Sequence, residues 1–242
     1  MDPVDLTVYF SVGLALSLFG GGGAIILIPY LTGSLGMPVD RAALLSLITI
    51  GTNTSIQSGI DRRTVQWKAV LVFSVVAIPA TALTARYLAP VVPDHVRMIL
   101  FGVFTLSVAV LMFFPLRPKD GESRNLAGIG ASALATGVLC GLVGVGGGIF
   151  IAPALGLFYR IPLKEAVKSS LAIVAIQSIT ALGAYLERGV RVPLQFALVM
   201  LLVIGLGVLV GRWVKPFIPE KNLKQGFAFF LIGIGTWVIL KP

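Results

Sequence analysis

Charge is what this 242-residue sequence has least of. Only 12% of its residues are charged, whereas a soluble domain has about 25%, so there are too few charges to cover a globular surface. Cys140 is the only cysteine, which excludes a disulfide scaffold. The 57% hydrophobic content and the lack of a G-X-Y period exclude disorder and a collagen-like repeat. We therefore predict an all-α polytopic membrane protein of the plasma membrane, which in bacteria is the inner membrane.

The basic residues are scattered singly and in pairs between apolar runs, although the net charge is +9. This pattern is typical of membrane flanks that face anionic lipid headgroups and not of a nucleic-acid interface. The expected partner is therefore the lipid bilayer, with no nucleic acid. We interpret Arg86 and Arg212, which lie at expected membrane boundaries, as headgroup anchors, with the recruitment of anions as the alternative.

Eight stretches without charge organise the chain. Six of them have 16 to 20 residues, close to the roughly 20 that a helix needs to cross the hydrocarbon core. The other two, 6–39 and 125–159, have 34 and 35 residues and contain a glycine cluster near the middle. They are too long for a single straight span, and glycine unwinds a helix at low cost. We predict that both are broken helices.

The two broken segments belong to an internal repeat. A shift of 124 residues aligns 22–59 with 146–183 without a gap, and glycine, proline and serine identities fall at fixed spacing. One such pair is Pro38 with Pro162. We therefore divide the chain into an N-terminal transmembrane repeat, a polar linker and a C-terminal transmembrane repeat, at 1–116, 117–124 and 125–242.

Two topologies are compatible with this repeat. If each broken segment crosses once, there are eight spans and parallel repeats, and Lys and Arg divide 10 against 9 between the two sides. If each is a re-entrant hairpin, each repeat keeps three full transmembrane helices, the repeats are inverted, and the division is 13 against 6. The positive-inside rule favours the hairpins, with 61–68 and 117–124 in the cytoplasm and both termini outside. Inverted repeats with broken helices are usual in secondary transporters.

The expected membrane stretches contain no Asp, Glu, Lys, Arg or His, and therefore none of the ionisable side chains that usually act in catalysis. No cluster has the spacing of metal ligands, and no Ser/His/Asp set could meet in the membrane interior. We therefore expect no enzyme, no catalytic residue, no metal and no cofactor. A small anion in the interior would have to be held by neutral groups.

Neutral hydrogen-bond donors lie at matched positions in both repeats. The glycine clusters precede two half-helices, whose free amide N–H groups and dipoles attract anions. Polar side chains follow on one face of the next helix. The alternatives are that the glycines serve close packing and that the side chains bond the backbone. The predicted substrate-binding residues are Gly21, Gly22, Gly23, Ser46, Thr49, Asn53, Gly146, Gly147, Gly148, Ser170 and Gln177.

The doubled motif resembles the sulfite exporter TauE/SafE family over nearly the whole chain. It reads GGGGAIILIPYL with LGMPVDRAALLS, and then GVGGGIFIAPAL with RIPLKEAVKSSL. Val145 stands where the first cluster has Gly21, so the two half-sites need not be equivalent. The resemblance implies a membrane transporter of small sulfur-containing anions such as sulfite, a sulfonate or sulfoacetate. The motif residues that it carries over by position are Gly20–Gly23, Pro29, Pro38, Ser46, Gly146–Gly148, Pro153, Pro162 and Ser170.

The leading functional hypothesis is a secondary transporter that exports such an anion by alternating access. The anion would be held at the repeat interface by half-helix amides and neutral polar side chains. An anion channel or uniporter without a coupled ion is the alternative, and a membrane scaffold without transport is a further one. A homodimer is one assembly compatible with the sequence.

Overall fold

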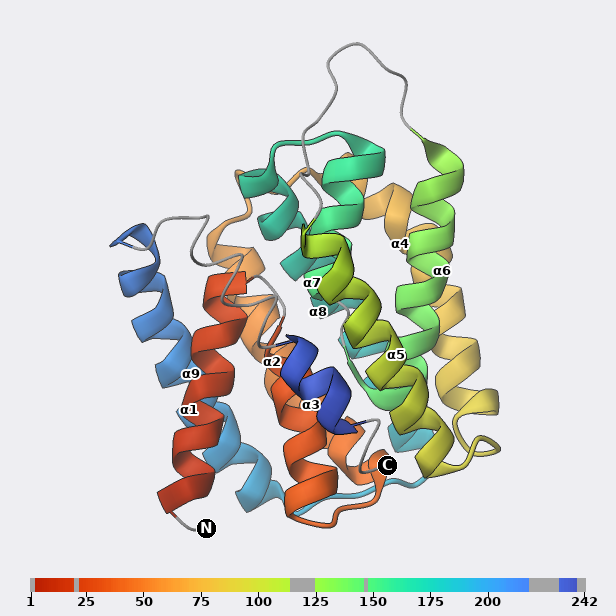
Figure 1. The fold of residues 1–242 in the computed structure, drawn as a ribbon, viewed down its shortest axis with the longest axis vertical. Coiled ribbons are helices and arrows are strands. Elements are labelled where there is room, and N and C mark those ends of the chain that lie inside the picture. The colour runs from red at the N-terminus through yellow and green to blue at the C-terminus, as the bar shows by residue number, and fades with distance from the viewer. Residues whose placement is uncertain (1–2, 20–21, 114–124, 146–147, 218–230, 239–242) are drawn as a thin grey trace.

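The computed structural model describes residues 3–19, 22–113, 125–145, 148–217 and 231–238 (Figure 1). All regular structure in these ranges is helical, which confirms the predicted all-α class. The first half contains α1 (Pro3–Phe19), α2 (Gly23–Pro29), the π-helical turn η1 (Tyr30–Ser34), α3 (Val39–Ile60), α4 (Trp67–Leu83), η2 (Thr84–Leu88) and α5 (Asp94–Phe113). The second half contains α6 (Leu126–Val143), α7 (Gly148–Ala154), η3 (Leu155–Tyr159), α8 (Leu163–Glu187), α9 (Leu194–Val214), η4 (Lys215–Phe217) and a helix at 231–238.

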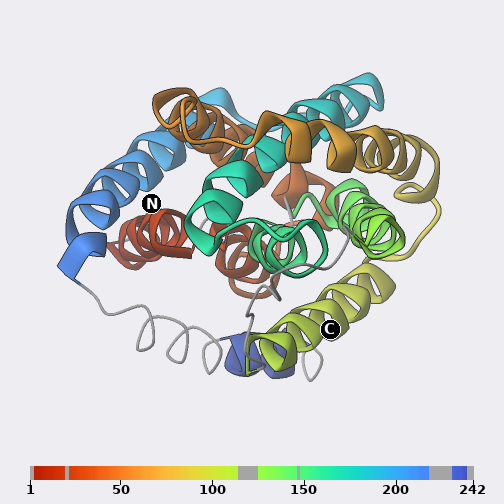
Figure 2. The same ribbon diagram turned by 90° about the horizontal axis from the view of Figure 1, so that it is seen from above.

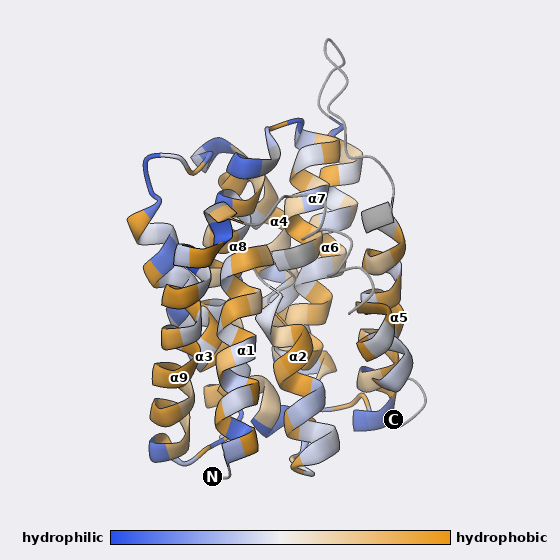
Figure 3. Ribbon diagram, turned by 60° about the vertical axis from the view of Figure 1, so that its left-hand side comes forward, coloured by the Kyte–Doolittle hydropathy of each residue, from blue (hydrophilic) through white to orange (hydrophobic). Residues whose placement is uncertain are grey.

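The outside of the bundle is apolar. Four of the described helices are long and apolar enough to cross a membrane, namely α4 with its continuation η2, α6, α8 and α9. Leu202, Leu206 and Leu209 of α9 are exposed, and hydrophobic residues run along the helices while hydrophilic ones gather at the two ends (Figure 3). An apolar belt of this kind is stable in lipid and not in water. The chain is a polytopic helical membrane protein.

The helix breaks fall at the predicted glycine clusters. α2 begins at Gly23, with Gly22 as its N-cap. α6 ends at Val143, and Gly144 after it has a φ of +76°, the left-handed conformation that commonly ends a helix. Four glycines of the predicted clusters lie outside the described residues, namely Gly20, Gly21, Gly146 and Gly147.

Each broken segment folds back on itself as a helical hairpin. The hydroxyl of Tyr30, directly after α2, donates to the carboxylate of Asp5 at the start of α1 over 2.5 Å. The N–H of Asn125, directly before α6, donates to the carbonyl of Phe158 in η3 over 3.0 Å. In each half the chain therefore leaves the hairpin at the end where it entered (Figure 1).

The two hairpins start from opposite ends of the bundle. Figure 1 shows α1 and α6 beginning at opposite ends, with α3, α4 and α5 between the two hairpins in the chain. This geometry agrees with the re-entrant alternative rather than with eight successive spans. The repeat boundaries and the side of the membrane that each end faces stay predictions.

Helices of the two halves pack on one another in a reciprocal pattern. α3 packs on α8, α1 on α9, and α6 on α4. Seen along the bundle, α9 and α4 lie outside α1 and α6 (Figure 2). The contact between the halves, rather than either half alone, therefore forms the core.

Glycines bring the paired helices into backbone contact. A Cβ added to Gly13 of α1 would overlap the carbonyl oxygen of Ile204 in α9 and lie 2.9 Å from the Cα of Gly207. A Cβ added to Gly137 of α6 would lie 2.7 Å from the carbonyl oxygen of Ala77 in α4. Membrane helices associate through such close packing, because apolar contact with lipid is as favourable as apolar contact with another helix.

Gly13→Ala should therefore lower the thermal unfolding temperature of the purified protein, since overpacking of such a contact costs roughly 1–3 kcal/mol. The control is Gly130→Ala in α6, where an added Cβ meets nothing within 4 Å and the better helix propensity of alanine should maintain or raise stability. Circular dichroism in detergent measures both. Equal unfolding temperatures for the two variants would contradict the close contact.

The orientation is testable with single cysteines in a Cys140→Ala background. Thr64 follows α3, and Val91 precedes α5 at the other end of α4; both are exposed. If the more basic end is cytoplasmic, an impermeant thiol reagent should label Val91→Cys in intact cells and Thr64→Cys only after permeabilisation. Labelling of Thr64→Cys in intact cells would show that the orientation is wrong.

Candidate functional site

α3 and α8 meet where the two halves of the molecule join. A Cβ added to Gly51 of α3 would lie 2.7 Å from the Cβ of Ser178 in α8. Both helices begin after a proline in the same backbone conformation, with φ −55° and ψ 142° at Pro38 and φ −54° and ψ 142° at Pro162. Proline fixes φ and has no N–H to leave unpaired at a helix start. The two related sequences therefore start their central helices in the same way.

Ser46 joins α3 to the glycine break of the other half. Its buried hydroxyl donates to the carbonyl oxygen of Gly144 over 3.0 Å. A Cβ added to Gly144 would lie 2.6 Å from the Cα of Ala43, so the backbone at the break lies directly on α3. The structure thus brings this predicted site residue to the second glycine cluster.

Thr49 and Asn53 are buried on α3 and bond within their own helix. The hydroxyl of Thr49 donates to the carbonyl of Leu45 over 2.7 Å, and Nδ2 of Asn53 donates to the carbonyl of Thr49 over 2.8 Å. The Oδ1 of Asn53 lies 3.5 Å from the position of a Cβ on Gly205 of α9. Asn53 therefore faces α9, and both predicted residues bond to the α3 backbone.

The described glycines of the predicted clusters are buried at the start of the half-helices. The carbonyl of Gly22 accepts the N–H of Ile25 over 3.2 Å. A Cβ on Gly23 would lie 3.0 Å from the carbonyl oxygen of Val12 in α1, so Gly23 permits close packing of the hairpin. Gly148 is the first residue of α7 and is buried.

Gln177 is the most unusual polar residue of the interior. It is 0% exposed, yet neither its Nε2 nor its Oε1 has a hydrogen-bond partner in the part of the chain that the structure describes. Gln57 of α3 is also buried, and its Nε2 has no partner within the same ranges. The hydroxyl of Ser170, one of the predicted residues, donates to the carbonyl of Val167 over 2.7 Å.

Gln57 lies four residues after Asn53, on the helix face that also holds Ser46 and Thr49. This spacing makes it part of the polar face expected for this helix, although it is not one of the substrate-binding residues predicted above. An unpaired buried amide group costs about 1–3 kcal/mol, so a polar ligand that paired with Gln57 or Gln177 would recover this cost.

A cluster of side-chain ion pairs lies at one end of the α3–α8 pair. Asp40, at the start of α3, accepts from Arg97 of α5 and from Arg188 after α8, each over 2.6 Å. Arg97 is 3% exposed and also donates to the carbonyls of Val92 and Ala89. Three elements of both halves are therefore tied together through one carboxylate.

A second cluster lies at the other end of α3. Asp61 lies 3.4 Å from Nζ of Lys168 in α8 and 3.3 Å from Nη1 of Arg212 in α9. Back at the Asp40 end, Arg86 of η2 pairs with Glu187, the last residue of α8, over 3.2 Å. Arg86 and Arg212 therefore each tie one half of the molecule to the other, and their role as headgroup anchors stays a prediction.

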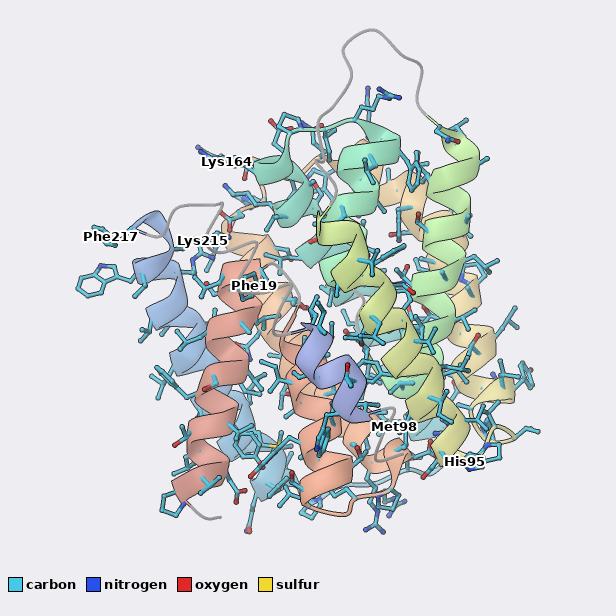
Figure 4. The ribbon with its side chains drawn as sticks, in the orientation of Figure 1. Phe19, His95, Met98, Lys164, Lys215 and Phe217 are labelled. Carbon is cyan, nitrogen blue, oxygen red and sulfur yellow. The ribbon has the colours of Figure 1, made fainter. Side chains whose placement is uncertain are left out.

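The ends of the bundle hold the titratable side chains labelled in Figure 4, with His95 at one end and Lys164 and Lys215 at the other. Within the described ranges, no group of three or more His, Cys, Asp or Glu side chains could hold a metal ion. In the interior of the described bundle, a ligand would therefore be bound through hydrogen bonds with neutral groups.

Comparison with known proteins identifies the family of this chain. The family model of the sulfite exporter TauE/SafE proteins matches residues 6–238. The chain belongs to the sulfite exporter TauE/SafE family. As a TauE/SafE protein it is a multi-pass membrane transporter and not an enzyme.

Several curated relatives named as probable membrane transporters align with this chain over nearly their whole length. A probable membrane transporter protein of Methanocaldococcus jannaschii is 27% identical over 255 residues, covering 98% of this chain and 95% of the relative. The probable membrane transporter protein YunE of Bacillus subtilis is 25% identical over 256 residues, covering 94% and 93%. One of Xylella fastidiosa is 25% identical over 241 residues, covering 94% and 91%. No solved structure matches the TauE/SafE chain significantly.

Asp40→Asn should destabilise the protein, because Arg97 and Arg188 would lose their shared carboxylate. Breaking a fully buried pair costs about 3–5 kcal/mol, and Asp40 is 28% exposed, so we expect the lower part of that range. The matched control is Glu187→Gln, which breaks a pair that is 57% and 62% exposed and should cost about 0–1 kcal/mol. Denaturant unfolding in mixed micelles compares them. Equal losses would contradict a structural role for the Asp40 cluster.

Proposed function

We propose that this TauE/SafE protein is a secondary transporter that exports small sulfur-containing anions, such as sulfite, a sulfonate or sulfoacetate, by alternating access. The observation that carries the proposal is Gln177, whose buried carboxamide has no partner among the described residues. Gln177 lies in α8, and the residue after it, Ser178, contacts Gly51 of α3 in the other half. Substrate sites of secondary transporters lie at such repeat interfaces.

Neutral donors suit a small anion in this position. The amide nitrogens of Gln177 and Gln57 are buried and unpaired in the described structure, and Asn53 has one further N–H beyond the one that Thr49 accepts. Hydrogen bonds to a charged acceptor are worth roughly 1.5–3 kcal/mol each. The half-helix amides at Gly22, Gly23 and Gly148 and at the clusters around them would add to this set.

The two ion clusters suit alternating access. The Asp40 cluster ties the halves at one end of α3, and the Asp61 cluster ties them at the other. A substrate between α3 and α8 would reach either side only if one cluster separates while the other holds. Rocking of one half against the other around a fixed site is the usual form of such transport.

Transport in proteoliposomes tests the proposal. The parent protein should show saturable uptake and counterflow of sulfite or sulfoacetate, whereas a channel would show conductance without counterflow. Gln177→Met keeps the size of the side chain and removes its hydrogen bonds. It should weaken apparent affinity by tenfold to a hundredfold, since about 1.4 kcal/mol corresponds to a factor of ten.

The control variant is Thr180→Val on the same helix, whose hydroxyl donates to the carbonyl of Ile176 over 2.9 Å. It should transport like the parent. A parent protein that moves no sulfur anion would overturn the proposed substrate class. A Gln177→Met variant that matches Thr180→Val would remove Gln177 from the site.

A further inference from the structure

The two polar ends of the Gln177 side chain require two kinds of hydrogen-bond partner. A carboxamide has two N–H donors and a carbonyl acceptor, and both ends of Gln177 lack a partner among the described residues. Because both ends are free, exchanging the assigned positions of nitrogen and oxygen would change nothing. A ligand that satisfies Gln177 must therefore supply a hydrogen-bond acceptor and also a donor.

Two hydroxyls of α3 that are predicted to bind substrate have no hydrogen left to donate to it. A serine or threonine hydroxyl has one hydrogen to donate and two lone pairs to accept. Ser46 gives its hydrogen to the Gly144 carbonyl, and Thr49 gives its hydrogen to the Leu45 carbonyl. What these buried hydroxyls can still offer a ligand is oxygen lone pairs, and those repel an anion that carries no hydrogen.

The charge of the surroundings limits the charge of the ligand. Between Arg41 and Asp61, α3 has no charged residue, and α8 has none between Lys168 and Glu187. Burying an ion without a counter-charge is costly, and the electrostatic cost of burial rises with the square of the charge. A singly charged ligand is therefore strongly favoured over a dianion.

We propose that the species bound at Gln177 of α8 is a singly charged sulfur oxyanion with its own hydrogen-bond donor. Hydrogensulfite, HO–SO2⁻, and hydroxy-sulfonates meet both conditions, whereas the sulfite, sulfate and sulfoacetate dianions do not. The inference thus narrows the proposed substrates and excludes sulfoacetate. This inference rests on the proposed function. Its consequence is that each sulfite leaves as hydrogensulfite, so that one proton and one net negative charge cross the membrane with each sulfur atom.

Two permanent monoanions that differ by one hydroxyl test the need for a donor. Isethionate is ethanesulfonate with a terminal hydroxyl, so the pair has the same charge and nearly the same size. Titration calorimetry on the full chain in nanodiscs should give isethionate an affinity at least tenfold higher. In Gln177→Met the ratio should fall toward one, and in Thr180→Val it should stay at the parent value.

The pH dependence of sulfite binding tests the charge. Above the second pKa of sulfite, the apparent affinity for total sulfite should fall about tenfold per pH unit, because the competent fraction falls by that factor. Isethionate does not titrate in this range, so a flat isethionate affinity shows that the protein itself is unchanged. Sulfate should bind at least tenfold more weakly than isethionate.

The outcomes separate this inference from the function on which it rests. Equal affinities for isethionate and ethanesulfonate, or sulfite affinity that does not fall with pH, would overturn the monoprotonated ligand and leave sulfur-anion transport standing. Binding of none of the four anions, sulfite, sulfate, isethionate and ethanesulfonate, would overturn the proposed function and this inference together.

Discussion

In a bilayer, helices gain little by exchanging lipid for another apolar surface, so this bundle depends on how closely its backbones approach one another. The contacts at Gly13 and Gly207 and at Gly137 join helices from different halves of the chain. Neither half could bury its hairpin alone, because α1 packs on α9 and α6 packs on α4. The candidate site can therefore form only when the two halves pack together, which is also the step that buries the hairpins.

The broken helices depend on this contact between halves. An irregular backbone at membrane depth is tolerated only where protein or a water-filled cavity surrounds it. At the second break, the Gly144 carbonyl accepts the hydroxyl of Ser46, and Ala43 lies against the Gly144 backbone. The same hydrogen bond that satisfies the break also removes the Ser46 hydrogen from the set of donors that a ligand could use. Structural support and ligand chemistry are thus linked at one residue.

Local signals in the sequence predicted much of the fold. Glycine runs placed the helix breaks, and Pro38 and Pro162 marked the starts of the two central helices because proline has few conformations and no N–H. The Asp40 cluster had no local signal, since its partners lie 57 and 148 residues away in the chain. Gln177 could be predicted as a site candidate from its repeat position. Its lack of a partner could not, because that depends on every helix around it.

The two ends of the central helix pair are held with different strength. At Asp40 both ion pairs measure 2.6 Å, and Arg97 is 3% exposed. At Asp61 the pairs measure 3.3 and 3.4 Å, and Lys168 and Arg212 are 34% and 33% exposed. Attraction between charges weakens with distance and with access of water. Separating the halves therefore costs more at the Asp40 end. For the alternating access proposed above, this difference predicts that the Asp61 end opens more readily than the Asp40 end.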